Sequence, residues 1–162
     1  MKRMTETKHI KKLSWEDIER LVIELGQQIK ASSFWPDYLV GITVGGLVPL
    51  ALLAKELGLN KIVTVSASSY EKDRQGELSI LYLPEIDLKG QKVLLVDEIA
   101  DTGQTLEKVS QVMREKYNPA ELRTAVMAIN QDKCQNRPDY FATAETGWVV
   151  FPWERKDFPE YF

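Results

Sequence analysis

The sequence predicts an α/β fold in which a twisted parallel sheet is flanked by helices. Apolar runs of strand length alternate with amphipathic segments of helix length, a pattern typical of right-handed crossovers between parallel strands. The run 93–96 is apolar without alternation, as expected of a strand that is covered on both faces. The chain has 162 residues, 44% of them hydrophobic, and we expect a single domain spanning 1–162.

The expected elements follow from local patterns. Ser14 and Asp17 resemble a capping box at the start of a first helix, whose apolar residues between Ile18 and Ile29 share one face. Strands are expected at 38–44, 61–67, 92–98 and 122–129, with an edge strand near 79–83. Further helices are expected over 47–60 and from about 104 through Met113.

Two unusual loops come directly after predicted strands. Gly45-Gly46 follows the strand at 38–44, and 97–105 follows the apolar run 93–96. Each loop precedes a helix N-terminus, where free N–H groups and the helix dipole favour an anion. Ligands of parallel sheets bind beyond the carboxyl ends of the strands, so we expect the functional site at these loops.

Composition excludes several classes of function. The formal charge of −3, with acidic and basic residues interspersed, provides no basic stripe for nucleic acid. Cys134 is the only cysteine, which rules out an internal disulfide or a zinc site of paired cysteines and favours a cytoplasmic location. No apolar run approaches the ~20 residues of a membrane span. His9, the only histidine, lies outside the motifs, which argues against a Ser-His-Asp mechanism.

The stretch "DTGQT" (101–105) offers backbone N–H groups, the hydroxyls of Thr102 and Thr105, and a glycine that permits close approach to a phosphate. A helix start with a glycine turn is the alternative. Asp97 and Glu98 precede this loop, and such a pair repels itself unless a cation or a hydroxyl-rich ligand lies between the charges. One carboxylate can meet a ribose hydroxyl or hydrated Mg²⁺.

Four segments resemble the type I phosphoribosyltransferases. "VLLVDEIADTGQT" resembles their phosphoribosyl-pyrophosphate signature, and "VGGLVPLALLAKELGL" resembles their pyrophosphate loop. "TVSASSYEKDRQGEL" is similar to their flexible hood, and "TGWVVFPWE" to the purine-binding segment of xanthine-guanine phosphoribosyltransferases. The resemblance implies a Rossmann-like core with a small hood built from 68–84 and 130–162.

The resemblance also implies an activity. The enzyme would transfer the 5-phosphoribosyl group from phosphoribosyl pyrophosphate to a 6-oxopurine (guanine, xanthine or hypoxanthine), with Mg²⁺ as cofactor, in purine salvage. It implies a homodimer or homotetramer. A catalytically weak regulator that binds a nucleotide or phosphoribosyl pyrophosphate is the alternative function, because one fold serves many functions.

Site residues follow from the same resemblance. Asp101 would be the general base near purine N7. The 5′-phosphate would be held by Asp101, Thr102, Gly103, Gln104 and Thr105, the pyrophosphate by Val44, Gly45 and Gly46, and the ribose hydroxyls or Mg²⁺ by Asp97 and Glu98. Ser69, Tyr70 and Arg74 would belong to the flexible hood. The purine would be bound by Asn130 or Lys133, Trp148, Val149 and Glu154.

The chain departs from the family pattern at two positions. Val44 stands where purine enzymes of this family often have an arginine, which removes a charge-assisted contact. Asn130 stands at or next to the family's lysine for the 6-oxo group, and the nearest lysine is Lys133. For Trp148 the alternative role is to cover the core from an edge strand. Glu154, near ring position 2, would favour guanine over hypoxanthine, and adenine should be a poor substrate.

Overall fold

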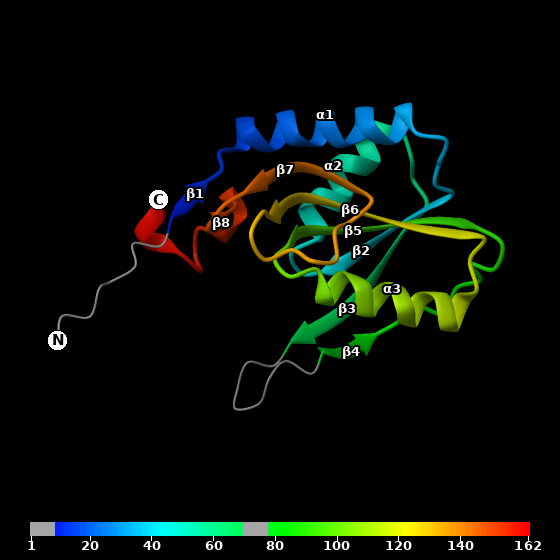
Figure 1. Cartoon of the computed structure of the whole chain (residues 1–162). Coiled ribbons are helices and arrows are strands. Elements are labelled where there is room, and N and C mark those ends of the chain that lie inside the picture. The colour runs from blue at the N-terminus through cyan, green and yellow to red at the C-terminus, as the bar shows by residue number, and fades with distance from the viewer. Residues whose placement is uncertain (1–8, 70–77) are drawn as a thin grey trace.

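The computed structural model describes residues 9–69 and 78–162, so the predicted hood residues Tyr70 and Arg74 lie outside the described part (Figure 1). A six-stranded sheet in the order β4-β3-β2-β5-β6-β7 forms the centre. Its strands are β2 (Tyr38–Thr43), β3 (Ile62–Ser69), β4 (Leu78–Tyr82), β5 (Lys92–Ala100), β6 (Glu121–Asn130) and β7 (Tyr140–Glu145). Only the edge pair β3–β4 is antiparallel, so the predicted, mostly parallel α/β sheet is confirmed.

Helices cover both faces of this sheet. Figure 1 shows α1 (Trp15–Ala31) and α2 (Leu47–Leu57) on one side and α3 (Gln104–Tyr117) on the other. The predicted capping box at the start of α1 is present, with 3.1 Å between the Asp17 nitrogen and Ser14 Oγ. Within 9–69 and 78–162, no helix is long and apolar enough to cross a membrane.

A second, two-stranded sheet joins segments that are far apart in the sequence. β1 (Ile10–Lys12) pairs in parallel with β8 (Trp148–Val150), and 3-10 turns follow at Pro152–Glu154 and Pro159–Tyr161. The sequence did not predict β1, because three residues without an alternating pattern carry no strand signal. It also did not predict β7, which pairs with β6 through the helix-free connection 131–139 although it lies in the range expected for the hood.

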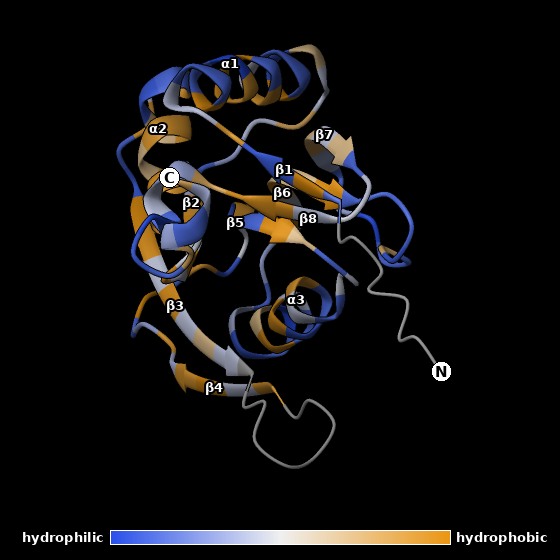
Figure 2. Cartoon of the chain, turned by 90° about the vertical axis from the view of Figure 1, so that its left-hand side faces the viewer, coloured by the Kyte–Doolittle hydropathy of each residue, from blue (hydrophilic) through white to orange (hydrophobic). Residues whose placement is uncertain are grey.

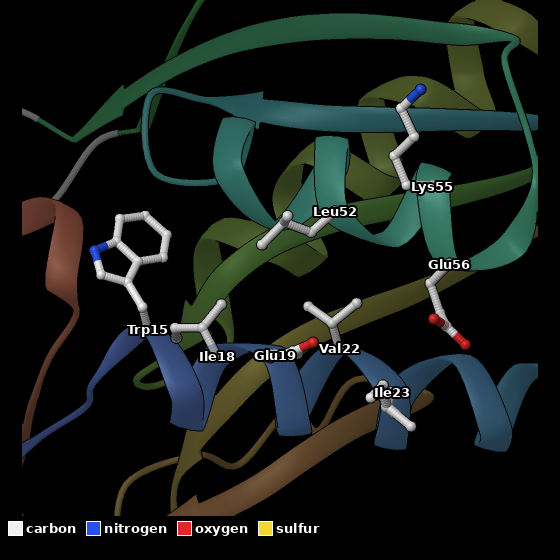
Figure 3. A pocket seen from close by; sticks show the side chains of 8 residues that line it. All are labelled: Trp15, Ile18, Glu19, Val22, Ile23, Leu52, Lys55 and Glu56. Carbon is white, nitrogen blue, oxygen red and sulfur yellow. The ribbon is translucent and has the colours of Figure 1, made fainter.

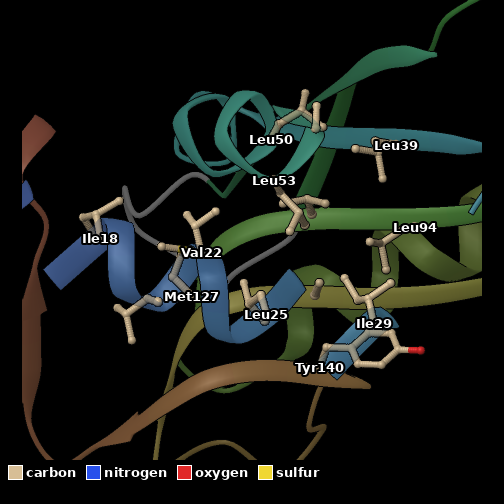
Figure 4. Close-up of a cluster of buried hydrophobic side chains, with 14 of the residues drawn as sticks. Ile18, Val22, Leu25, Ile29, Leu39, Leu50, Leu53, Leu94, Met127 and Tyr140 are labelled. Atoms are coloured by element: carbon tan, nitrogen blue, oxygen red, sulfur yellow. The ribbon is translucent and has the colours of Figure 1, made fainter. Parts of the chain in front are cut away.

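The core has two parts, one on each face of the sheet. Leu94 and Val96 pack with α1 and α2, whereas Val93 and Leu95 pack on the side of α3, and all four side chains are fully buried. Figure 4 shows the first part, where Leu94 lies among side chains of α1, α2 and the neighbouring strands. Figure 2 shows hydrophobic residues concentrated in the central strands. The expectation that 93–96 is covered on both faces is therefore confirmed.

The connections place the loops of interest together. The chain passes from β2 through α2 to β3 on one face, and from β5 through α3 to β6 on the other. The direction of winding changes between the adjacent strands β2 and β5, and such a switch point is where open α/β sheets bind ligands. The loops that follow β2 and β5 both begin there.

Gly46, between β2 and α2, shows how closely the backbone segments approach. A Cβ atom at Gly46 would lie 2.6 Å from the Ile42 carbonyl oxygen and 2.7 Å from that of Val96. Both atoms belong to sheet strands, which cannot move without breaking the pairing of β2 with β5. The sequence therefore needs a glycine here on steric grounds alone.

We expect Gly46→Ala to lower the free energy of unfolding by about 1–3 kcal/mol, the usual cost of overpacking. Urea denaturation measures this change. Gly58→Asn is the matched control: Gly58 has a φ of 67° with open space around it, and asparagine tolerates this conformation. A Gly46→Ala protein as stable as Gly58→Asn would contradict the steric explanation.

Candidate active site

The loop after β5 lies against the connection between β6 and β7. The Thr102 carbonyl accepts hydrogen bonds from the backbone nitrogens of Gln135 (3.2 Å) and Asn136 (3.4 Å). Gly103 has a φ of 86°, and a Cβ atom there would overlap the Asn136 carbonyl oxygen. Only glycine meets both conditions, so the turn of the predicted phosphate loop depends on Gly103.

The two helices that begin at this edge lack the capping that α1 has. Gly46 and Gly103 occupy the N-cap positions of α2 and α3, so neither N-cap residue has a side chain to accept a hydrogen bond. One residue earlier, Thr102 Oγ1 accepts from the Gln104 nitrogen of α3 at 3.3 Å. The N–H groups of a helix's first turn need partners outside the helix. Two such N-termini beside one another suit a ligand with two anionic groups.

Glu98 lies where the two loops meet. A Cβ atom at Gly45 would be 2.5 Å from Glu98 Oε1, which places this carboxylate against the backbone of the loop after β2. Asp97 precedes it, and Asp97 Oδ1 accepts a hydrogen bond of 2.8 Å from the Glu98 nitrogen. The structure thus brings together the predicted pyrophosphate loop and the predicted ribose-binding acids.

Burial changes the acidity of both carboxyls. It raises the pKa of Asp97 to about 7, against the lowering effect of the Glu98 N–H, and the Glu98 charge raises it further. Burial also raises the pKa of Glu98 to about 7; a hydrogen bond from Trp153 acts in the opposite direction, and the charges of Glu154 and Asp157 add to the increase. Each carboxylate is therefore costly as an anion unless a cation or a hydroxyl approaches it.

Trp153 is a site residue that sequence reasoning missed. Its indole Nε1 donates to Glu98 Oε2 at 2.7 Å. The ring stacks on Phe151, with 4.8 Å between centroids and 15° between planes, and lies 5.9 Å from the Trp15 ring. The only signal in the sequence was the aromatic density of the C-terminal segment, which does not say which ring reaches a carboxylate 55 residues away.

β8 carries two of the predicted purine-binding residues, Trp148 and Val149. Trp148 is 43% exposed, with Phe158 packed edge-on at 5.9 Å. The Trp148 nitrogen donates to His9, and the Val150 carbonyl accepts from Leu13, both in the direction of β1. Alternate residues of a strand turn their N–H and C=O groups to opposite edges, so those of Val149 face away from β1, at the edge of β8 that no described strand covers.

The side chains of Glu154 and Lys133 differ in their contacts within the protein. Glu154 Oε2 accepts a hydrogen bond of 2.8 Å from the Phe151 nitrogen, and burial raises the pKa of this carboxyl. The Lys133 side chain is exposed and makes no ion pair with any residue in 9–69 or 78–162. The ammonium of Lys133 is therefore available to a ligand.

Asn130, by contrast, has its amide fully engaged. Its Nδ2 donates to Asp101 Oδ1 at 3.0 Å and to the Gly147 carbonyl at 3.2 Å. The backbone nitrogens of Asp132 and Lys133 donate to its Oδ1 at 3.0 and 3.1 Å. An asparagine amide has two hydrogens and accepts at two positions, so Asn130 has none left for a purine in this arrangement.

The acid pair also fits Mg²⁺, provided that a substrate supplies the other ligands. In the described residues, no three His, Cys, Asp or Glu side chains are grouped so as to hold a metal by themselves. Mg²⁺ usually binds through one or two carboxylates together with substrate phosphates and waters. Asp97 and Glu98, beside two helix N-termini, offer one or two carboxylates for such a site.

Two cavities lie away from these residues. A pocket of about 410 Å³ between α1 and α2 is lined by four aliphatic side chains together with Trp15 and three charged residues, as Figure 3 shows. A second cavity, of about 290 Å³, lies beside α3 and is lined by polar residues that include Arg114 and Asp139. Neither of these two cavities is lined by a predicted site residue.

Comparison with known proteins identifies the family. The family model described as "Phosphoribosyl transferase domain" matches residues 13–157. This chain belongs to the phosphoribosyltransferase family. The xanthine-guanine phosphoribosyltransferase of Chromohalobacter salexigens is 36% identical over 146 residues, which are 88% of this chain and 82% of the relative.

Solved structures are also similar. The xanthine-guanine-hypoxanthine phosphoribosyltransferase of Helicobacter pylori is 27% identical, with a TM-score of 0.82 over 94% of this chain and 99% of the other. A hypothetical protein from Neisseria gonorrhoeae with bound ppGpp is 25% identical, with a TM-score of 0.82 over 96% of this chain and 95% of the other. The predicted family resemblance is confirmed.

The raised pKa values predict how stability depends on pH. In metal-free buffer, the folded chain binds more protons at Asp97 and Glu98 than the unfolded chain does between pH 4 and 7, where the ordinary values are 3.8 and 4.5. The free energy of unfolding should therefore fall as the pH rises through this range. Asp97→Asn keeps an acceptor for the Glu98 N–H and removes a charge, so we expect a Tm at pH 8 about 5 °C above that of the unmodified protein.

Thermal denaturation at pH 5–8 with EDTA measures this effect. Asp87→Asn is the matched control, because Asp87 is exposed and its Oδ1 likewise accepts one backbone hydrogen bond, from Lys89 at 3.0 Å. A lower Tm for Asp97→Asn than for the unmodified protein at pH 8 would contradict the expected cost of the buried charge.

Proposed function

We propose that this member of the phosphoribosyltransferase family transfers the 5-phosphoribosyl group from phosphoribosyl pyrophosphate to a 6-oxopurine in purine salvage. The products would be the nucleoside monophosphate and pyrophosphate. The observation that carries the proposal is the position of the half-buried Asp97–Glu98 pair beside two helix N-termini whose N-cap residues are glycines. The Chromohalobacter salexigens relative is named as a xanthine-guanine phosphoribosyltransferase, which supports a purine as the acceptor.

Each helix N-terminus would hold one anionic end of the donor. The N-terminus of α3, with Thr102 to Thr105, would bind the 5′-phosphate, and the loop of Val44 to Gly46 at α2 would bind the pyrophosphate. Asp97 and Glu98, between the two, would face the ribose hydroxyls. When bound with the donor, Mg²⁺ neutralises charge on the departing pyrophosphate.

The chemistry needs no nucleophilic side chain. The bond from ribose C1 to the pyrophosphate oxygen breaks, and a bond from C1 to a purine nitrogen forms. Positive charge develops at the ribose in between, and the nearby carboxylates stabilise it. The proton of the purine nitrogen would pass to Asp101, the predicted general base.

Purine recognition would come from β8 and the connection after β6. Trp148 has the exposed ring for stacking on the base, and the backbone groups of Val149 lie at a free strand edge. We assign the 6-oxo contact to Lys133 rather than Asn130, because both amide hydrogens of Asn130 are donated within the protein. Glu154 would lie near ring position 2.

A nucleotide-binding regulator is the second candidate. The likeness to the Neisseria gonorrhoeae protein with bound ppGpp favours it, since that protein binds a nucleotide with several phosphates. Val44 in place of an arginine points in the same direction, because the pyrophosphate loop lacks a charged contact. In this case the chain would bind phosphorylated ligands with little turnover.

Two further features belong to the proposal. A cytoplasmic location fits Cys134, which is free and buried. A homodimer or homotetramer fits the apolar surface beside the pyrophosphate loop, where Val44 is 79% exposed and Leu47 40% exposed. Light scattering of the purified protein measures the oligomeric state.

Turnover of four bases with Mg²⁺ and phosphoribosyl pyrophosphate tests the function. We expect kcat/KM to be higher for guanine than for hypoxanthine, because the Glu154 carboxylate can accept from the 2-amino group that hypoxanthine lacks. Xanthine should fall below guanine, since its 2-oxo group would face an acceptor. Adenine should be poor, because its 6-amino donor would meet the Lys133 donor. Adenine as the best substrate would overturn the 6-oxopurine assignment, and no turnover of any base would favour the regulator.

The role of Lys133 is tested separately. We expect Lys133→Ala to raise the KM for guanine about 10-fold, through loss of one charge-assisted hydrogen bond, and to leave the Kd of phosphoribosyl pyrophosphate unchanged. Steady-state kinetics and calorimetry measure the two quantities. Lys89→Ala, which removes an exposed lysine before β5, is the control. An unchanged KM for guanine in Lys133→Ala would remove this residue from purine recognition.

A further inference from the structure

Asn130 joins three segments of the site at one buried point. It is the last residue of β6 and is 3% exposed. Its amide bonds to Asp101 in the loop after β5, to the turn that contains Asp132 and Lys133, and to Gly147 in the turn between β7 and β8. The predicted general base and the residue before Trp148 are therefore held by one side chain.

The orientation of the amide is determined by its surroundings. Two backbone N–H groups, those of Asp132 and Lys133, point at one end of the Asn130 amide, which must therefore be the oxygen. The other end faces Asp101 Oδ1 and a carbonyl, both acceptors, and must be the NH₂ group. A reversed amide would lose all four hydrogen bonds.

The Gly147 end of this network is also fixed in place. Gly147 has a φ of 83°, and a Cβ atom there would overlap the His9 carbonyl oxygen. Its carbonyl therefore has a defined position against β1, and the Asn130 amide is held between this carbonyl and Asp101. A carboxylate that accepts from a donor held in this way has little freedom to rotate.

We propose that Asn130 is a positioning residue for the transfer reaction, which holds Asp101 Oδ1 so that Oδ2 is the oxygen that accepts the purine proton. The inference rests on the proposed transferase function. A neutral donor suits this task better than a lysine does, because an ammonium stabilises the carboxylate anion more strongly and so weakens it as a base. Asn130 thereby acts through Asp101 and does not touch the substrate.

Asn130→Asp tests the proposal with the least change in shape. Aspartate keeps both acceptor positions for the backbone nitrogens of Asp132 and Lys133, loses the donors to Asp101 and Gly147, and adds a charge beside Asp101. We expect kcat to fall at least about 10-fold, as for other residues that orient a reacting group, with the KM of phosphoribosyl pyrophosphate within about 2-fold of the unmodified value. Asn60→Asp, the same change at an exposed position after α2, is the control.

Exchanging the side chains at positions 101 and 130 separates a loss of kcat caused by poor folding from one caused by loss of positioning. In the double variant Asp101→Asn with Asn130→Asp, the amide at position 101 can donate to the carboxylate at 130, which restores this hydrogen bond with reversed direction. We expect part of the Tm lost in Asn130→Asp to return, while kcat stays at the level of Asp101→Asn alone, about 10²–10⁴-fold below the unmodified enzyme.

The outcomes separate this inference from the proposed function. Absence of turnover in the unmodified protein would overturn both. An active unmodified enzyme together with an unchanged kcat for folded Asn130→Asp would overturn the positioning role alone. The positioning role would also be overturned if Asn130→Asp lowered kcat by the same factor in the Asp101→Asn protein as in the unmodified protein. The effect on kcat would then not pass through Asp101.

Discussion

The cost of holding two adjacent, half-buried carboxylates at the end of β5 is the constraint on which the rest of the site depends. β5 is covered on both faces by helices along 93–96, and the two carboxyls that follow are half-buried, which raises the pKa of each to about 7. The surroundings offset this cost only in part, through one backbone N–H and one indole N–H. Two helix N-termini whose N-cap residues are glycines lie alongside. In the folded protein the two carboxylates therefore lack a cation and the two helix N-termini lack an anion. A cation and a phosphorylated ligand would supply these partners.

Local patterns were enough to predict the fold. The apolar run before Asp97, the capping box of Ser14 and Asp17 and the glycines that precede α2 and α3 each depend on neighbours within a few residues, and the family resemblance rested on the same stretches. Several contacts that sequence reasoning missed are long-range. β1 pairs with β8, and Trp153 reaches Glu98, because packing brings these segments together. The hydrophobic periodicity of the sequence does not indicate which distant segments will contact one another. The roles of the individual site residues stay predictions.

Asn130 shows how one substitution changes the interpretation of a motif. Alignment with the family placed it where a lysine would contact the base, and composition offered no reason to choose between Asn130 and Lys133. The hydrogen bonds provide the reason: the Asn130 amide is occupied on all sides, and the same bonds fix the backbone nitrogen of Lys133. In the proposed reaction, Asn130 would hold the Asp101 carboxylate on one side and the backbone of Lys133 on the other, without touching the substrate.

The pairing of β1 with β8 has a consequence for synthesis of the protein on the ribosome. Ile10 emerges early and its partner Trp148 emerges late, so the small sheet cannot close until nearly all of the described chain has been translated. The same late segment carries the indole that reaches Glu98. A nascent chain can build the six-stranded sheet beforehand, but its acid pair then lacks one of its few neutral partners. Completion of the site therefore waits for synthesis of β8 and Trp153, and a product truncated before β8 would carry the half-buried carboxylates without the segment proposed to bind the purine.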